Sequence, residues 1–243
     1  MRITRLAFVI FASVAVLRAQ VVQLKSTDAV LERYKIVLGG VEAIKNVQSE
    51  TVHGEVEGTG MQGKATFVSY SKPFKSLFKL TRSDGSQVTA GFDGATSWSV
   101  DAKGASIDKD TASESIRRDA DLQYALHQTD YFKKLEFAGI TDFEGHRCYW
   151  LHGTTHWGKD NNQFYDVDTG LLAGYRFEAD DASKTISTLL FQDYKSFGGP
   201  LVATKQTVHT GDRIRTFTKT SVSYEPIPDS IFEMPAAVKA LLK

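Results

Sequence analysis

The sequence predicts a mainly β protein in which one strongly curved antiparallel sheet is covered by two helices. Short segments rich in β-branched and aromatic residues follow one another from residue 51 to residue 224, and turn residues separate them. Two segments, 27–44 and 113–126, instead carry apolar residues at helical spacing. Because a curved sheet has an apolar concave face, we expect the helices to cover that face.

The first helix is predicted to begin at Thr27. Apolar residues from Leu31 to Val41 recur at steps of three and four, which places them on one helix face. Gly39 and Gly40 interrupt the pattern, and a short continuation through Ile44 is expected. A single apolar face of this kind is suited to packing on a larger element.

The strand pattern begins at Glu50 and is interrupted by the second predicted helix, 113–126. Turn pairs such as Asp84-Gly85 and Asp93-Gly94 leave only short connections, so successive strands should pair as antiparallel neighbours. We expect roughly ten strands in one sheet. The candidate strands are 51–57, 64–70, 76–82, 87–92, 96–100, 136–143, 147–153, 163–167, 172–178, 185–194, 202–209 and 213–224.

The N-terminus has the pattern of a secretory signal peptide at 1–19. Two arginines precede the apolar run Leu6–Leu17, and Ala19 is suited to be the last residue before cleavage. The alternative is an uncleaved anchor, because Arg18 makes the cleavage region imperfect. We expect residues 20–243 to be one exported, periplasmic and soluble domain.

Charge and cysteine content exclude several classes of protein. Lys plus Arg and Asp plus Glu both number 29, and the two signs are interspersed, so no basic surface for nucleic acid is expected. Cys148 is the single cysteine of the chain; it cannot form an internal disulfide or carry a lipid at a new N-terminus. The stability of the chain must therefore come from a hydrophobic core. We also expect a monomer.

No catalytic or metal site is predicted. His152 and His156 are four residues apart at the end of a strand, where that spacing spans ~13 Å and is too long for one metal ion. A Gly-x-Ser-x-Gly nucleophile motif is missing from the sequence. Cys148, on a predicted strand, is interpreted as a buried structural thiol. We expect no cofactor.

Large apolar side chains on neighbouring strands are the strongest candidates for a binding site. Residues two apart share a face of a strand, so they form apolar rows that could contact an acyl chain on the concave side. The predicted ligand-binding residues are Phe67, Phe78, Leu80, Phe92 and Trp98. Lys72 and Phe74 are predicted at the rim, where a cation could meet a head group and a ring could guard the entrance. The alternative is that all five apolar residues pack against the helices as ordinary core.

The segment 64–100 resembles the periplasmic outer-membrane lipoprotein carriers of the LolA type. The likeness rests on a basic residue with Pro, an aromatic strand, an Asp-Gly turn and a strand that carries Trp. These features correspond here to Lys72-Pro73, Phe78, Asp93-Gly94 and Trp98. The preceding helix, the hairpin YDVDTGLLAGYRFE and the tail SIFEMP follow the same order.

The resemblance implies an incomplete β-barrel, LolA/LolB-like, with a helical lid over a cavity that shields lipid or lipoprotein acyl chains from water. It also implies an inner-membrane donor and an outer-membrane acceptor protein as partners. In the typical carrier an Arg precedes the Pro and a Phe lies three residues after it, whereas Lys72 and Ser76 occupy these positions here. A broader non-catalytic lipid binder is therefore favoured. Two alternatives stay open: a cofactor-free enzyme on the same fold that acts on a hydrophobic small molecule, and a periplasmic scaffold that binds proteins.

Overall fold

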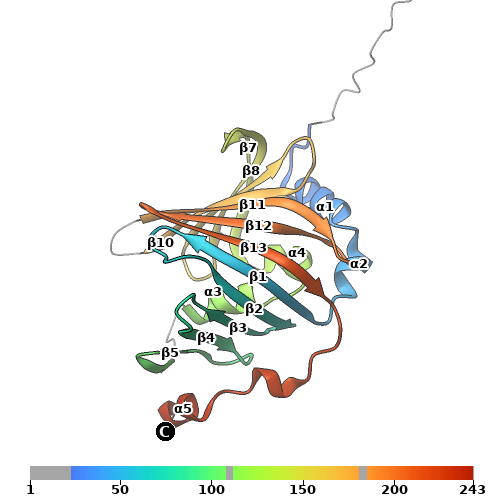
Figure 1. Cartoon of the computed structure of the whole chain (residues 1–243). Helices are drawn as coiled ribbons and strands as arrows, with labels where there is room; N and C mark the ends of the chain where they lie inside the picture. The colour runs from blue at the N-terminus through green and yellow to red at the C-terminus, as the bar shows by residue number, and fades with distance from the viewer. Residues whose placement is uncertain (1–22, 108–111, 181–184, 243) are drawn as a thin grey trace, which may run out of the picture.

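The computed structural model describes residues 23–107, 112–180 and 185–242, so the predicted signal peptide, 1–19, lies outside the described residues. Thirteen strands form one antiparallel sheet that curves strongly without closing (Figure 1). The predicted fold class, a mainly β protein with a single curved antiparallel sheet, is confirmed. The strand number is higher than the roughly ten expected.

Most strands coincide with the predicted segments, and the addition is β6, a short strand that the sequence pattern did not indicate. The strands are β1 (Glu50–Gly58), β2 (Ala65–Lys72), β3 (Lys75–Thr81), β4 (Gln87–Phe92), β5 (Ser97–Asp101), β6 (Gly104–Ile107), β7 (Phe132–Phe143), β8 (His146–Thr155), β9 (Asp160–Asp166), β10 (Leu172–Asp180), β11 (Thr185–Ser196), β12 (Leu201–Thr210) and β13 (Arg213–Ser223).

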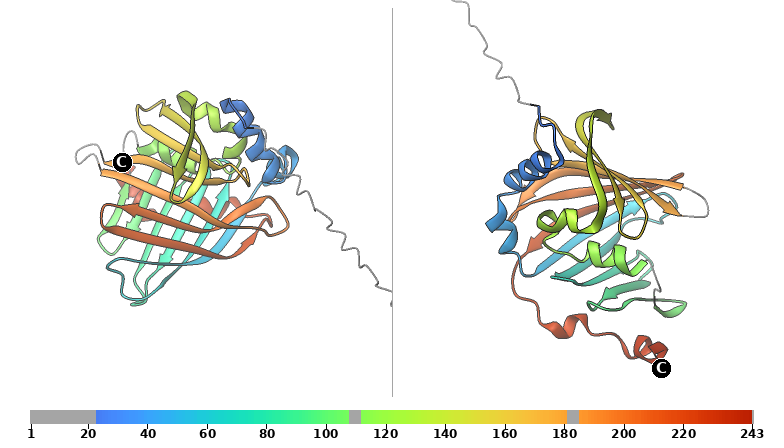
Figure 2. Two further views of the ribbon diagram at one scale, coloured as in Figure 1. Left: turned by 90° about the horizontal axis from the view of Figure 1, so that it is seen from above. Right: turned by 180° about the vertical axis from the view of Figure 1, so that it is seen from behind.

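The strand order explains why helices cross the concave face. The order is β6-β5-β4-β3-β2-β1-β13-β12-β11-β10-β9-β8-β7, so the chain runs outward from β1 to one edge and returns from the other edge to β13. The connection from β6 to β7 must therefore join the two edges of the sheet. It carries α3 (Ala112–Asp119), α4 (Tyr124–His127) and the 3-10 turn η1 (Gln128–Tyr131), which lie across the concave side (Figure 2).

The two predicted helical segments are present, and each is divided. The first forms α1 (Thr27–Val37) and α2 (Val41–Lys45), separated at Gly39 and Gly40 as expected. The Ser26 side chain caps α1 by accepting a hydrogen bond from the Ala29 N–H at 3.2 Å. The segment 113–126 was predicted as one helix; it is instead interrupted after Asp119. Among the described residues, no helix has the length and apolarity that a membrane span requires.

The main core lies where α1 packs on the concave face of β8, β9 and β10. Its edge-to-face ring pair, Tyr34 on α1 and Tyr165 on β9, has centroids 5.2 Å apart. This core consists of Val30, Leu31, Tyr34, Leu38, Ile44, Tyr149, Leu151, Tyr165, Val167 and Leu172. Helix α1 therefore covers one half of the concave face.

A second core lies on the outer face of the sheet, beneath the C-terminal segment. Leu77 on β3 and Trp98 on β5 pack there against the tail, which contains η2 (Asp229–Phe232), α5 (Ala236–Lys239) and η3 (Ala240–Leu242). Gly91 on β4 lies opposite Trp98, and a Cβ at Gly91 would lie 2.4 Å from the indole ring. The tail thus closes an outer surface that α1, α3 and α4 do not reach.

Candidate functional site

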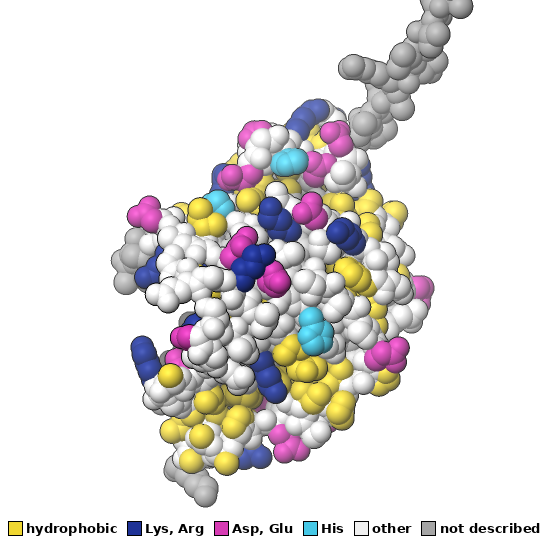
Figure 3. Space-filling view, in the orientation of Figure 1, with side chains coloured by type: hydrophobic (Ala, Val, Ile, Leu, Met, Phe, Trp, Pro, Cys, Tyr) yellow, Lys and Arg dark blue, Asp and Glu magenta, His cyan; other side chains and the backbone are white. Residues whose placement is uncertain are grey.

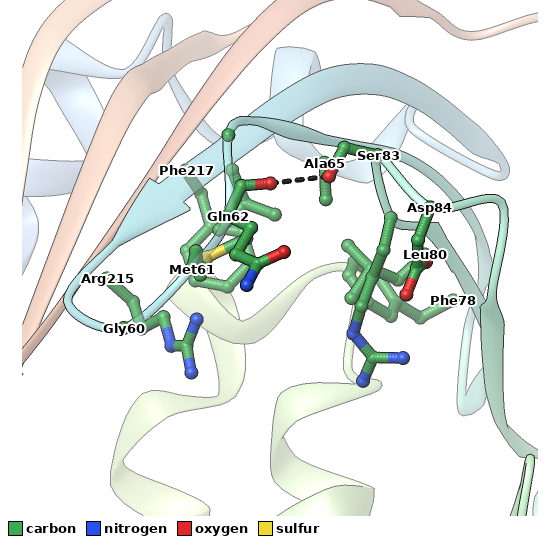
Figure 4. Close-up of a pocket in the computed structure, with 13 residues that line it drawn as sticks. Gly60, Met61, Gln62, Ala65, Phe78, Leu80, Ser83, Asp84, Arg215 and Phe217 are labelled. Atoms are coloured by element: carbon green, nitrogen blue, oxygen red, sulfur yellow. Dashed lines mark hydrogen bonds between the residues drawn. The ribbon is translucent and has the colours of Figure 1, made fainter.

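A pocket of about 530 Å³ opens on the concave face where β1, β2, β3 and β13 lie side by side (Figure 4). We call it the concave pocket. Its floor is apolar, and loops at one end of these strands form its mouth. The lining residues are Val56, Gly60, Met61, Gln62, Gly63, Ala65, Phe78, Leu80, Arg82, Ser83, Asp84, Arg215 and Phe217.

Strand register brings the apolar floor together. Phe67 pairs with Leu80 across β2 and β3, and Val56 pairs with Phe217 across β1 and β13, so these side chains share a face. The Phe67 ring stacks on Phe78 at 5.6 Å between centroids and meets Phe217 edge-on at 5.9 Å. These contacts make a continuous aromatic surface beneath the pocket.

Gly54 on β1 leaves room for the Phe67 ring to lie close to the sheet. A Cβ at Gly54 would lie 2.4 Å from the Phe67 ring and 2.4 Å from the Thr218 carbonyl oxygen. Phe67 can therefore lie flat against the sheet and remain only 8% exposed. A larger residue at position 54 would push the ring into the pocket.

Polar groups occupy the mouth of the concave pocket. The Ser83 hydroxyl donates to the Gln62 carbonyl and ties the β3–β4 turn to the β1–β2 loop. Arg82 and Arg215 bring positive charge to this mouth, and Asp84 brings one negative charge. Hydrogen bonds from Ser86 to the Asp84 carboxylate hold the pKa of Asp84 below its usual value, with a smaller contribution from Arg82.

Four of the five predicted ligand-binding residues lie on the concave face. Phe78 and Leu80 line the concave pocket, and Phe67 lies directly beneath them. Phe92 is on the same face, because it pairs with Ser76 on β3, but it borders a second cavity at the other end of these strands. That second cavity, about 520 Å³, is lined by Phe92, Gly94, Ala95, Arg117, Asp130, Tyr131, His156 and Trp157.

The prediction that Trp98 faces the concave side is wrong. Trp98 pairs with Gly91, whereas the neighbouring Phe92 pairs with Ser97, so Trp98 and Phe92 point to opposite faces. The indole is 1% exposed and packs under the C-terminal tail. Trp98 therefore belongs to the outer core.

The predicted rim residues, Lys72 and Phe74, both contact other parts of the chain and do not line the concave pocket. Lys72 Nζ lies 2.6 Å from the Asp229 carboxylate of the tail, so its charge is paired on the outer side of the sheet and the rim assignment is wrong for this residue. Phe74 occupies the β2–β3 turn, and its ring lies beneath the Arg117 guanidinium of α3 at 5.2 Å. Phe74 is at the end of β2 and β3 opposite to the concave pocket.

Arg82 and Arg215 are the site residues that our sequence analysis missed. Arg82 follows Leu80 by two positions and Arg215 precedes Phe217 by two, so strand alternation places each on the face of its apolar neighbour. That signal was available in the sequence. Met61, by contrast, comes from the irregular β1–β2 loop, where no periodicity operates.

On the half of the concave face that α1 covers, a buried polar network joins η1 to β9. Gln128 Nε2 donates to Gln163 Oε1 at 2.8 Å and to Tyr165 Oη at 2.5 Å, and Tyr165 Oη donates to Gln163 Oε1 at 2.8 Å. Burial raises the pKa of Tyr124 to about 12 and that of Tyr34 further. These phenols stay protonated and act as hydrogen-bonding core groups.

The arrangement nearest to a catalytic dyad lies at the α3–α4 junction. Asp121 Oδ2 accepts a hydrogen bond from Tyr131 Oη at 2.8 Å and lies 2.9 Å from His127 Nδ1, while its Oδ1 accepts from the Gln123 N–H at 3.0 Å. Within the described residues, His127 has no hydrogen bond to a Ser, Thr or Cys side chain. The Asp121 carboxylate thus connects the Gln123 backbone, α4 through His127 and η1 through Tyr131.

The histidines that were weighed as metal ligands and the single cysteine lie apart from one another in the structure. No three His, Cys, Asp or Glu side chains are grouped as metal ligands in the described parts of the chain. His152 Nδ1 lies 3.0 Å from the Asn162 side-chain oxygen, and His156 borders the second cavity. Cys148 is buried as predicted, and burial, together with Asp166 and Asp142, raises the pKa of its thiol to about 12.

The outer surface was compared with the concave pocket for charge and for cavities. On the face that carries β1 and β11–β13, acidic and basic side chains are interspersed and no single-sign area dominates (Figure 3). An outer cavity of about 570 Å³ adjoins the β9–β10 turn, but polar turn residues such as Asp166 and Thr169 form much of its border. The concave pocket differs from this cavity in that two arginines line it, whereas the charged residues of the outer cavity are acidic, with one histidine.

No protein-family model matches the sequence, and no curated protein matches it. Among the solved structures that are similar in fold are the following three. A DUF1329 family protein from Desulfovibrio piger is 16% identical with a TM-score of 0.61, covering 88% of this chain and 100% of that one. A LolA superfamily protein from Nitrosomonas europaea is 11% identical with a TM-score of 0.61, covering 87% and 99%.

The third structure, a domain named as an outer-membrane lipoprotein-sorting protein from Vibrio parahaemolyticus, is 11% identical with a TM-score of 0.56 and covers 83% of this chain and 94% of that one. At these identities the likeness concerns the fold, and it agrees with the open barrel described above. The chain therefore has a LolA-like fold.

Proposed function

We propose that this chain is an exported, non-catalytic periplasmic protein that binds the acyl chains of lipids or lipoproteins. The observation that carries the proposal is the concave pocket, in which Phe78, Leu80 and Phe217 line an accessible apolar floor on the inner face of an open barrel. Leaving an acyl chain in water costs ~0.8 kcal/mol per CH₂, so a soluble carrier requires such a surface. The volume of about 530 Å³ is suited to a lipid-sized ligand.

Three further observations support the proposal. The fold resembles proteins named for the LolA superfamily and for lipoprotein sorting. The sequence pattern of residues 1–19 is typical of export. The Asp121–His127 pair lacks a hydrogen-bonded nucleophile within the described residues, which favours binding over catalysis. The proposal includes two protein partners: a donor at the inner membrane and an acceptor at the outer membrane.

Copurification gives the first test. Native mass spectrometry of the protein purified from a periplasmic extract should show a bound species with the mass of a lipid. The same measurement should detect a chain that lacks residues 1–19. A ligand-free protein that also fails to bind any acyl probe in vitro would refute the carrier function.

Substitution of Phe78 tests the position of the site. Phe78→Glu places a charge on the apolar floor, so binding of a fluorescent fatty acid should weaken tenfold or more. The fold should persist, because Phe78 is only partly buried. Thr81→Glu, on the outer face of the same strand, is the matched control and should bind as the wild type does. A folded Phe78→Glu protein with unchanged affinity would place the site elsewhere.

A further inference from the structure

The mouth of the concave pocket carries two arginines above an apolar floor. Arg82 directly follows β3, two residues beyond Leu80, and Arg215 lies on β13, two residues before Phe217. They come from strands on opposite sides of the β1–β2 pair. Figure 4 shows Arg215 on one side of the pocket and the Asp84 turn, which follows Arg82, on the other.

The protein neutralises only part of the positive charge at this mouth. Within the described residues, the Arg215 guanidinium forms no hydrogen bond or ion pair with another side chain. Arg82 Nη1 donates to the neutral Ser86 hydroxyl at 3.1 Å, which leaves its remaining N–H groups available. Asp84 is the single acidic residue among the lining residues, and its Oδ1 accepts from the Ser86 N–H at 2.9 Å within its own turn. Two guanidinium groups thus outweigh one carboxylate.

The combination selects a particular ligand chemistry. Guanidinium groups match the oxygens of carboxylates and phosphates through paired N–H donors. A purely apolar ligand would leave this capacity unused, and an anion without a chain would leave the aromatic floor in contact with water. An amphiphile with an anionic head satisfies both parts.

We propose that Arg82 and Arg215 bind the anionic head group, a carboxylate or a phosphate monoester, of a single-chain amphiphile whose chain lies on Phe78, Leu80 and Phe217. This inference rests on the proposed acyl-chain binding and adds the head-group class and its two recognition residues. The head would remain at the loop end of the strands, and the chain would run toward Phe67.

The test compares four probes of defined chemistry by isothermal titration: a fatty acid, the alkyl phosphate of equal length, the fatty alcohol of equal length, and inorganic phosphate. Wild-type protein should bind both anionic amphiphiles about tenfold more tightly than the alcohol, as expected for two part-exposed charge-assisted hydrogen bonds. This preference should shrink as salt is raised. Inorganic phosphate should bind weakly or not at all.

A double variant, Arg82→Gln with Arg215→Gln, should lose the anion preference while binding the alcohol as before. The matched control, Lys79→Gln with Lys205→Gln, removes the same charge from the outer faces of β3 and β12 and should keep the preference. Equal wild-type affinity for acid and alcohol would overturn the inference and leave acyl-chain binding intact. Tight binding of inorganic phosphate alone would overturn it as well. Failure to bind any chain would refute both proposals.

Discussion

The two halves of the concave face belong to one sheet, yet they differ in how deeply their apolar side chains are buried. Over β8–β10, α1 seals the face, and Tyr149, Leu151 and Tyr165 are fully buried there. Over β1–β3 and β13, Phe78, Leu80 and Phe217 are only partly buried and line a pocket. We call these the closed half and the open half. The difference teaches that the same apolar alternation is buried as core or left to line a pocket according to where α1 packs on the sheet.

Matched leucine substitutions should give the largest contrast between the halves. Leu151→Ala leaves a cavity in the closed half, so the free energy of unfolding should fall by about 3 kcal/mol and the melting temperature by about 6–12 °C. Leu80→Ala, in the open half, should cost about 1 kcal/mol, since Leu80 already borders a pocket.

Ligand affinity should show the reverse order. Leu80→Ala should weaken binding of a fluorescent fatty acid, whereas Leu151→Ala should leave it unchanged at a temperature where the variant is folded. Thermal unfolding and fluorescence titration of the same two preparations check both quantities. Equal stability losses would show that the open half is also sealed in solution.

Substitution of one glutamine in each half should give a difference of intermediate size in the free energy of unfolding. Gln128→Leu removes two hydrogen bonds from the closed half, to Gln163 and Tyr165, and should lower the free energy of unfolding by about 1–2 kcal/mol. Gln206, on β12 opposite Phe217, faces the open half and is less buried. Gln206→Leu should therefore be nearly neutral. Urea unfolding measures both, and a neutral Gln128→Leu would mean that the network adds no stability.

Much of this fold could be read from local sequence patterns. Alternation placed Phe78 and Leu80 on the concave face correctly, and applied to Arg82 and Arg215 it would have found the pocket mouth as well. Helix periodicity found α1 and its interruption. These features depend on neighbours within a few residues, which is the range over which sequence periodicity is informative.

The errors at Trp98 and Lys72 involve contacts distant in sequence, whereas the missed strand β6 is a local feature. Trp98 has an apolar environment on the outer face because the tail, more than a hundred residues later, packs over it. Lys72 is held by Asp229 through the same tail. Strand β6, Gly104–Ile107, has only four residues and too few apolar positions to show a period. For Trp98 and Lys72, long-range packing decides what the local pattern leaves undetermined.

The smallest expected effect comes from Glu50, a half-buried carboxyl at the β1 end of the open half. It shares a strand face with Val52, and withdrawal from water raises its pKa above the ordinary 4.5, although Lys219 on the paired strand partly offsets the rise. A raised carboxyl pKa destabilises the folded chain above pH 4.5, because the unfolded chain ionises first. Below that pH both states are protonated and the cost disappears.

Glu50→Gln should therefore raise the melting temperature at pH 7–8, and the gain should vanish below pH 4.5. Glu57→Gln is the matched control, since this exposed side chain lies on the outer face of the same strand and its loss should change stability little. Differential scanning calorimetry across this pH range measures both variants. A destabilised Glu50→Gln protein at neutral pH would mean that attraction to Lys219 exceeds the desolvation cost, and that the interior of the open half is more hydrated than its apolar lining indicates.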